Sequence, residues 1–154
     1  MLNFKAYFPL TLIFIFSFFM SACQQQYVVG PTQPTEAALV ANAIENGMTT
    51  ELDIPYQTAF ENLKTAYRIC VAFTRDDELL FTDNELNTQL EMATLFGRSE
   101  GKVYTYKTTL EKTRDNKTRM TLYLPQGFKY AKARFKQDIK RALGKDQYCK
   151  ASSI

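Results

Sequence analysis

The chain starts with a nearly continuous apolar segment and then changes to patterns of mixed polarity. Leu, Ile and Phe occupy most positions of residues 8–19, after a short start that carries Lys5. Spanning a bilayer takes about 20 apolar residues. This run is shorter, contains Pro9 near its start and closes on small residues. It therefore predicts a cleaved secretory signal over residues 1–22 rather than a membrane-spanning helix.

The segment after the leader is polar and has no apolar period. It contains Gly30 and two prolines, so residues 23–34 are expected to be a flexible linker. A short helical segment is predicted over residues 35–47, where Thr35 can cap the helix and Gly47 can end it. Residues 48–150 are expected to form one domain, and residues 151–154 a C-terminal tail.

The domain begins with a strand and a helix. Polar and apolar residues alternate over residues 49–54, which predicts a half-buried strand. Pro55 suits the first turn of a helix, and apolar residues then recur at three- and four-residue spacing as far as Cys70. Residues 79–81 predict a brief strand, which a turn at Asp83 and Asn84 would end.

Three further strands are predicted over residues 87–96, 102–112 and 117–124, with turn-forming residues between them. A last amphipathic helix is predicted over residues 128–143, and Gly144 supplies its stop. Strands joined by short turns make an antiparallel sheet, and amphipathic helices can cover one face of it. The sequence therefore predicts an α+β fold in which two main helices pack on one face of a four- to five-stranded sheet.

Cys23 ends the sequence Met20-Ser21-Ala22-Cys23 directly after the apolar run. This segment resembles the lipobox of bacterial lipoproteins, a Leu-Ala/Ser-Gly/Ala-Cys pattern in which Met20 here replaces the commonest residue. The resemblance implies that the Cys23 thiol is diacylated, the leader is removed and the new amino terminus is acylated. Two or three acyl chains would hold the protein on a membrane. The alternatives are an ordinary cleaved signal and an uncleaved anchor.

The residue after the lipidation site bears on localisation. Gln24 stands where Asp would favour retention in the inner membrane. The resemblance therefore implies a lipid anchor in the outer membrane, with the domain in the periplasm. The inner membrane and the cell surface are alternative locations. The remainder of the chain resembles small single-domain envelope lipoproteins of unassigned function, without a motif that transfers a site.

Two cysteines, Cys70 and Cys149, follow the lipidation site in an exported and oxidising compartment. A disulfide between them would close a loop of about 80 residues, which the chain-entropy model values near 4.5 kcal/mol. Two buried thiols are the alternative. Because a disulfide needs Cα atoms roughly 5.5 Å apart, we expect the two main helices to end at the same edge of the sheet and to run nearly parallel.

The sequence contains no histidine. This excludes Ser-His-Asp and Cys-His catalysis and His-ligated zinc, and we expect neither a cofactor nor a metal.

The densest acidic patch is interpreted as a solvated loop, with a cation site or a hydrolytic carboxylate pair as alternatives. It consists of Asp76, Asp77 and Glu78, with Asp83 and Glu85 nearby. Ser99 and Lys102 match the S-x-x-K pattern of penicillin-binding proteins, but they fall in a predicted hairpin turn rather than at a helix start.

Charge is divided along the chain. Residues 36–100 carry twelve acids and four bases, and residues 112–150 carry twelve bases and three acids. A row of lysines recurs on the side of the last predicted helix that is opposite its apolar stripe. The row consists of Lys129, Lys132, Lys136 and Lys140, with Arg134, Arg141 and Lys145 beside them. This face is either solvated or a contact surface for anionic lipid, peptidoglycan or another envelope protein. Nucleic acid is not an expected partner outside the cytoplasm. Tyr104, Tyr106 and Tyr123 are candidates for the open face of the sheet.

These observations favour a non-enzymatic binding or envelope-assembly module tethered to a membrane. One alternative is a small carboxylate-based, glycan-active hydrolase, which would need a deep pocket and a perturbed pKa. The other is an inhibitor of a host or rival enzyme, which would present a protruding loop around Arg98 or Arg114.

Overall fold

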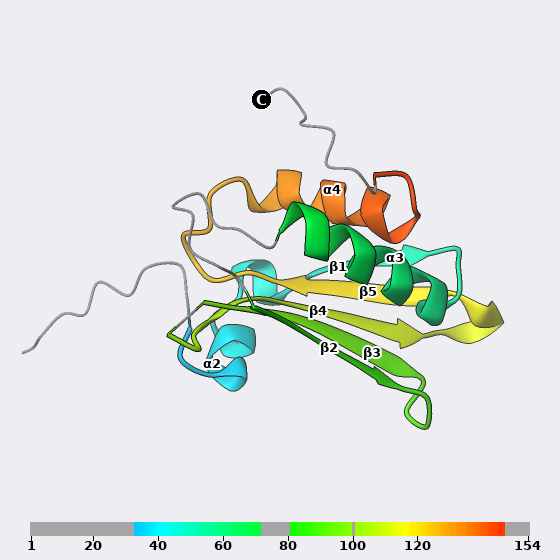
Figure 1. The fold of residues 1–154 in the computed structure, drawn as a ribbon, viewed down its shortest axis with the longest axis horizontal. Helices are drawn as coiled ribbons and strands as arrows, with labels where there is room; N and C mark the ends of the chain where they lie inside the picture. The colour runs from blue at the N-terminus through cyan, green and yellow to red at the C-terminus, as the bar shows by residue number, and fades with distance from the viewer. Residues whose placement is uncertain (1–32, 72–80, 100, 147–154) are drawn as a thin grey trace, which may run out of the picture.

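A five-stranded antiparallel sheet forms the centre of the fold (Figure 1). The computed structural model describes residues 33–71, 81–99 and 101–146. The strands are β1 (Met48–Leu52), β2 (Phe81–Asn87), β3 (Met92–Arg98), β4 (Tyr104–Lys112) and β5 (Thr118–Tyr123), and the helices are α2 (Glu36–Ala41), α3 (Tyr56–Cys70) and α4 (Ala131–Ala142). The predicted α+β class and antiparallel sheet are confirmed.

The strand order is β1-β5-β4-β3-β2. Strands β2 to β5 follow one another as hairpins, whereas β1 pairs with β5 at the edge of the sheet. Because opposed residues point to the same face, Leu110 shares a face with Ala93 on one side and Met120 on the other. All three side chains are buried, and they form part of the core.

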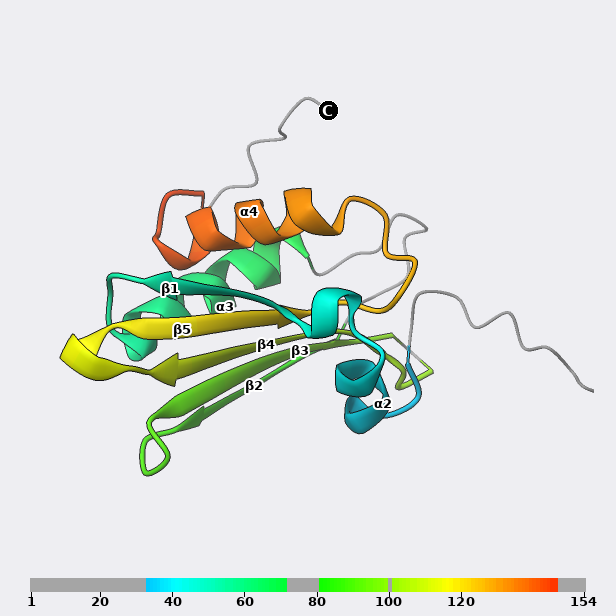
Figure 2. The same cartoon turned by 180° about the vertical axis from the view of Figure 1, so that it is seen from behind.

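Helices α3 and α4 cover one face of the sheet, and the short helix α2 lies on the other face near one end (Figures 1 and 2). The apolar stripe of α3 supplies Ala59, Leu63 and Tyr67, which are fully buried against the sheet. The cap predicted for α2 is present, since Thr35 Oγ1 accepts a hydrogen bond from the Ala38 amide at 3.1 Å.

The two main helices run in opposite directions. Asn62 Nδ2 on α3 donates to the Ala142 carbonyl of α4 at 2.8 Å. Farther along α3, Tyr67 contacts Asp138, which comes earlier in α4. The expectation of nearly parallel helices is therefore wrong. After α4 the chain turns back along the helix: the Lys145 amide donates to the Lys140 carbonyl, and Gln137 contacts Asp146.

Several predicted boundaries also differ, among them the start of β3, which is Met92 rather than residue 87. Asp83 and Asn84 lie inside β2 rather than in a turn, and the turn between β2 and β3 comes later, where Asn87 Oδ1 accepts from the Leu90 amide at 2.9 Å. The first predicted helix is shorter, because α2 ends at Ala41 and a separate 3-10 turn covers Ile44–Asn46. Helix α4 begins three residues late, because Tyr130 has a left-handed backbone with φ of 61°.

The tyrosines expected to share the open face are divided between the two faces of the sheet. The strand register shifts between Gly97 and Arg98. Tyr104 packs edge-on against Phe96, with ring centroids 5.7 Å apart, on the face away from α3. Tyr106 packs edge-on against Tyr67 of α3 at 5.1 Å, and it is buried. Tyr106 keeps the regular register opposite Gly97 and lies in the core, whereas the irregularity beyond this pair places Tyr104 on the other face of the sheet.

Candidate functional site

The predicted lysine face is exposed in the structure. Lys132, Lys136 and Lys140 lie on α4 and Lys129 lies just before it, and all four residues are exposed. Lys132 forms a surface ion pair with Glu45 at 3.1 Å. Within the described part of the chain, Lys129, Lys136 and Lys140 have no acidic side chain within ion-pair distance.

Arg134 and Arg141 do not belong to this exposed face. Their side chains keep only 16% and 10% of their exposure, because both contact the buried Asp138. The expectation that they extend the basic surface is therefore wrong. On α4, Arg134 lies four residues before Asp138, and Arg141 lies three residues after it. This spacing brings the three side chains to one side of the helix.

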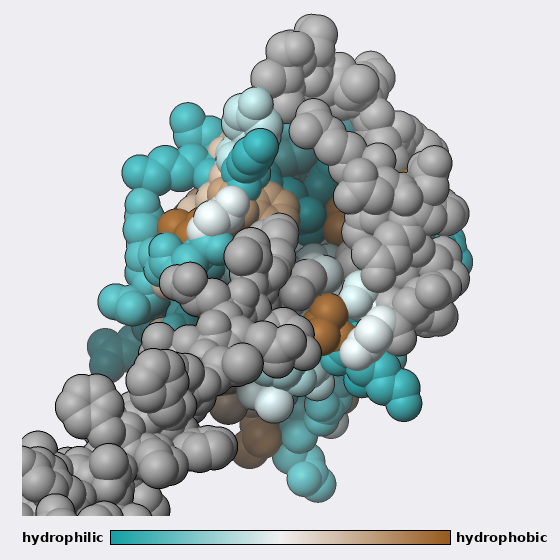
Figure 3. All heavy atoms as spheres, turned by 90° about the vertical axis from the view of Figure 1, so that its left-hand side faces the viewer, coloured by the Kyte–Doolittle hydropathy of each residue, from teal (hydrophilic) through white to brown (hydrophobic). Residues whose placement is uncertain are grey.

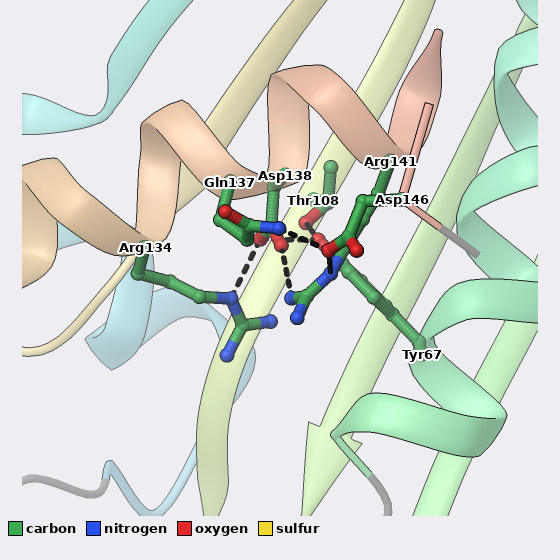
Figure 4. A network of polar contacts seen from close by, with 7 residues as sticks. All are labelled: Tyr67, Thr108, Arg134, Gln137, Asp138, Arg141 and Asp146. Atoms are coloured by element: carbon green, nitrogen blue, oxygen red, sulfur yellow. Dashed lines mark hydrogen bonds and ion pairs between the residues drawn. The ribbon is translucent and has the colours of Figure 1, made fainter. Parts of the chain in front are cut away.

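Asp138 is the centre of a polar network between α3, α4 and β4 (Figure 4). Its carboxylate is fully buried. It accepts hydrogen bonds from Tyr67 Oη at 2.7 Å, Arg134 Nε at 2.7 Å and Arg141 Nη1 at 2.9 Å. A buried charge is costly unless it is paired and hydrogen-bonded, and these three donors compensate the Asp138 carboxylate.

The network extends in two directions. The Tyr67 hydroxyl lies 2.9 Å from Thr108 Oγ1 on β4, which links α3 to the sheet. Arg141 Nε lies 3.5 Å from Asp146, which also accepts a hydrogen bond from Gln137. Two arginines thus face two aspartates, and the buried cluster carries no net charge. The arrangement fixes how α3, α4 and the returning chain lie against each other.

Burial changes the pKa values of the aromatic members of this region. Desolvation and the Asp138 charge hold the pKa of Tyr67 well above its ordinary value. Desolvation raises the pKa of Tyr106 as well. Burial alone would lower the pKa of Arg134, but Asp138, Tyr67 and Tyr106 together more than offset this, and the pKa lies above its ordinary value. Both tyrosines are therefore protonated, and Arg134 is charged, at neutral pH.

The Arg134 guanidinium also lies against two aromatic rings. Its Cζ is 5.2 Å from the Tyr67 ring centroid and 5.1 Å from that of Tyr106, a cation–π arrangement. Arg134 Nη2 and Tyr106 Oη are buried without a hydrogen-bond partner in the structure described. The end of the domain at which β4 begins carries hydrophilic and hydrophobic residues side by side (Figure 3).

The other predicted site residues are divided between described and undescribed segments. Cys23, Cys149 and the acidic residues 76–78 lie outside the described residues. Asp83 and Glu85 are exposed on the edge strand β2, and Asp83 forms an ion pair with Arg98. A hydrolytic pair needs a carboxyl of raised pKa in a cleft, so these exposed positions do not favour that hypothesis. Ser99 and Lys102 form a tight turn, since the Lys102 amide donates to the Ser99 carbonyl at 2.8 Å.

The buried network was not anticipated from the sequence. The spacing of Arg134, Asp138 and Arg141 is a readable signal for one shared side of a helix. Nothing in that spacing distinguishes a buried side from a solvated one, and the partners Tyr67 and Thr108 are distant in the chain. Only the packing of α4 onto α3 and β4 brings these residues together.

Among the described residues, no group of three or more cysteines and carboxylates is arranged to hold a metal ion. None of the described helices is both long enough and apolar enough to cross a bilayer. No protein-family model matches the chain, and no curated protein sequence matches it.

Proposed function

We propose that this protein is a lipid-tethered envelope lipoprotein whose domain acts as a non-enzymatic binding or assembly module in the periplasm. The Met20-Ser21-Ala22-Cys23 segment after the apolar leader supports the tether. The described domain begins at Gln33, whose backbone pairs with Tyr104 at the start of β4. Residues 24–32 would span at most about 35 Å between the lipidated cysteine and this point, which allows the domain to stay near the membrane surface.

The distribution of surface charge carries the binding proposal. The exposed charged residues of α4 are all lysines, because the acid of this helix, Asp138, is buried. The exposed charges of α3 add Arg68 and the Lys64–Glu61 pair. On the opposite side of the domain, basic side chains are matched by acids, as in the pairs Lys107–Glu36, Lys117–Glu51 and Arg119–Glu111. Among the described residues, the helical layer is therefore the surface with excess positive charge.

An anionic envelope component is the partner that this surface fits. About 1 kcal/mol per basic residue near an anionic surface adds up over several lysines. Anionic lipid headgroups, peptidoglycan carboxylates and an acidic envelope protein all share the required charge. The outer membrane is the proposed site of the anchor.

A disulfide between Cys70 and Cys149 is part of this proposal. Cys70 ends α3, three residues after Tyr67, which contacts Asp138. The chain beyond α4 returns along the helix as far as Asp146, which contacts Gln137. From Asp146, three residues extend at most about 10 Å. This return path supports the pairing although the helices are antiparallel.

The proposal is tested by chemical crosslinking of the tethered protein in the envelope of a Gram-negative cell. We expect a variant with Lys129, Lys132, Lys136 and Lys140 changed to Glu to lose most of its crosslinked envelope component. A control variant with Lys102, Lys112, Arg114 and Arg119 changed to Glu, all exposed positions outside the two main helices, has the same net charge, and it should retain that component. Equal crosslinking by both variants would remove the lysine face from the proposed function.

A further inference from the structure

Tyr130 combines three properties that are seldom found together. Its side chain is large, the residue is 63% exposed, and its backbone has φ of 61°. A bulky residue at positive φ is an outlier, and such a conformation costs of order 1–3 kcal/mol. The neighbouring turn contains Gly127 with φ of 82°, where a glycine meets the same demand without strain. The fold thus holds an aromatic residue out toward solvent at the entrance to α4.

The surroundings of Tyr130 are basic. Lys129 precedes it, and Lys132, Lys136 and Lys140 continue along the exposed side of α4. Tyrosine is enriched at membrane interfaces, where its ring lies at the level of the headgroups, and lysines near an anionic membrane surface are attracted to it.

The entry of the chain into the domain lies at the same end of the sheet. Gln33 pairs with Tyr104, the first residue of β4. The segment before Tyr130 follows the end of β5 and is held there by the Gln126 amide, which donates to the Asn42 carbonyl. In Figure 1, α4 begins at the end of the sheet where α2 and the start of β4 lie. A tether of at most about 35 Å from Gln33 is long enough to let this end and the outer side of α4 reach the bilayer.

We propose that the helical layer docks on the anionic headgroups of the membrane that carries the Cys23 lipid, with Tyr130 in the interface. The lysines of α4 supply the charge attraction, and the phenol ring supplies an amphipathic anchor. The lipid anchor raises the local concentration of the docking face at the membrane, so that individually weak contacts are enough for docking. This inference rests on the proposed tether, and it selects lipid headgroups among the anionic partners.

The chain contains no tryptophan, so a single introduced Trp is a specific reporter. Mature protein extracted from membranes and carrying Tyr130→Trp is reconstituted in vesicles of brominated lipid, with and without phosphatidylglycerol. The control reporter is Leu90→Trp, at an exposed position in the β2–β3 turn. We expect the Tyr130→Trp fluorescence to be quenched several-fold more than that of Leu90→Trp in the anionic vesicles. The difference should fall when the salt concentration is raised.

A charge variant separates docking from anchoring. Each of Lys129→Glu, Lys136→Glu and Lys140→Glu is expected to weaken docking at least fivefold, from about 1 kcal/mol per contact, while the protein stays on the vesicles through its lipid. Equal quenching of the two reporters in protein that sediments with the vesicles would overturn the docking. Protein that does not sediment with the vesicles would overturn the tether, and the docking with it.

Discussion

A Cβ atom added at Gly97 on β3 would lie 2.1 Å from Cε1 of Tyr106 on the neighbouring strand. The Tyr106 ring therefore occupies the space that a side chain at Gly97 would need. This ring cannot move freely, because it packs edge-on against Tyr67. The absence of a side chain at Gly97 is what lets Tyr106 lie between the sheet and α3.

Gly97→Ala is expected to destabilise the domain by about 1–3 kcal/mol, the usual cost of overpacking a core. Urea unfolding followed by circular dichroism measures this change. The matched control is Gly101→Ala, where the nearest atom to the added Cβ is Ser99 Oγ at 3.9 Å. Equal stability of the Gly97→Ala and Gly101→Ala variants would show that the Tyr106 ring does not occupy this position.

Asp138→Ala should be the most destabilising single change in the polar network. It leaves Arg134 and Arg141 without the carboxylate that compensates them, and breaking a buried ion pair costs about 3–5 kcal/mol. The exposed Asp53→Ala serves as the control, with an expected effect within about 1 kcal/mol, because it removes only a surface ion pair with Lys117. Thermal unfolding of both variants gives the comparison. A mild effect at Asp138 would mean that the network is solvated.

Alkaline pH is expected to destabilise the fold through the buried tyrosines. The pKa values of Tyr67 and Tyr106 are raised above the ordinary value of 10.0, mainly by burial. The unfolded chain therefore loses these protons first, so the stability that they contribute is complete below about pH 10 and falls above it. Each tyrosine contributes a slope of about 1.4 kcal/mol per pH unit in that range.

Urea unfolding at a series of alkaline pH values tests this expectation. The loss of stability should be shallower in Tyr106→Phe, which removes one titrating group whose hydroxyl has no hydrogen-bond partner in the structure described. That variant should fold with unchanged or higher stability at neutral pH, because it removes a buried unsatisfied group. An unchanged pH slope in Tyr106→Phe would contradict the assignment.

The elements that the sequence predicts best are those in which the local signals agree. Helix α3 has Pro55 at its start and a continuous apolar stripe, and it spans Tyr56–Cys70 as expected. Strand β5 alternates buried and exposed residues at Thr118, Arg119 and Met120. In both cases the apolar period and the flanking residues indicate the same structure.

The extent of strand β2 was wrong, because the local signals after residue 81 oppose their tertiary context. Asp83 and Asn84 favour turns, yet they pair with Phe96 and Leu95 on β3 and lie in the middle of an edge strand. Helix direction was missed for a similar reason. The argument from Cys70 and Cys149 assumed that the chain stops near the end of α4, whereas it turns back along that helix as far as Asp146.

Cys149→Ser is expected to destabilise the protein by about 4 kcal/mol under oxidising conditions, as the chain-entropy model predicts for a loop of this size. Cys70→Ser should cost a similar amount, and the double variant should cost no more than either single variant. Additive effects of the two substitutions would contradict a shared disulfide. Gel mobility with and without reductant gives an independent measurement.

The acylation of Cys23 is the central claim, since the proposed compartment and the docking surface both depend on it. Mass spectrometry of the amino-terminal peptide from membrane-extracted protein tests it most directly. The account predicts a peptide that begins at residue 23 and carries two or three acyl chains. An unmodified cysteine, or a peptide that still contains the leader, would contradict it.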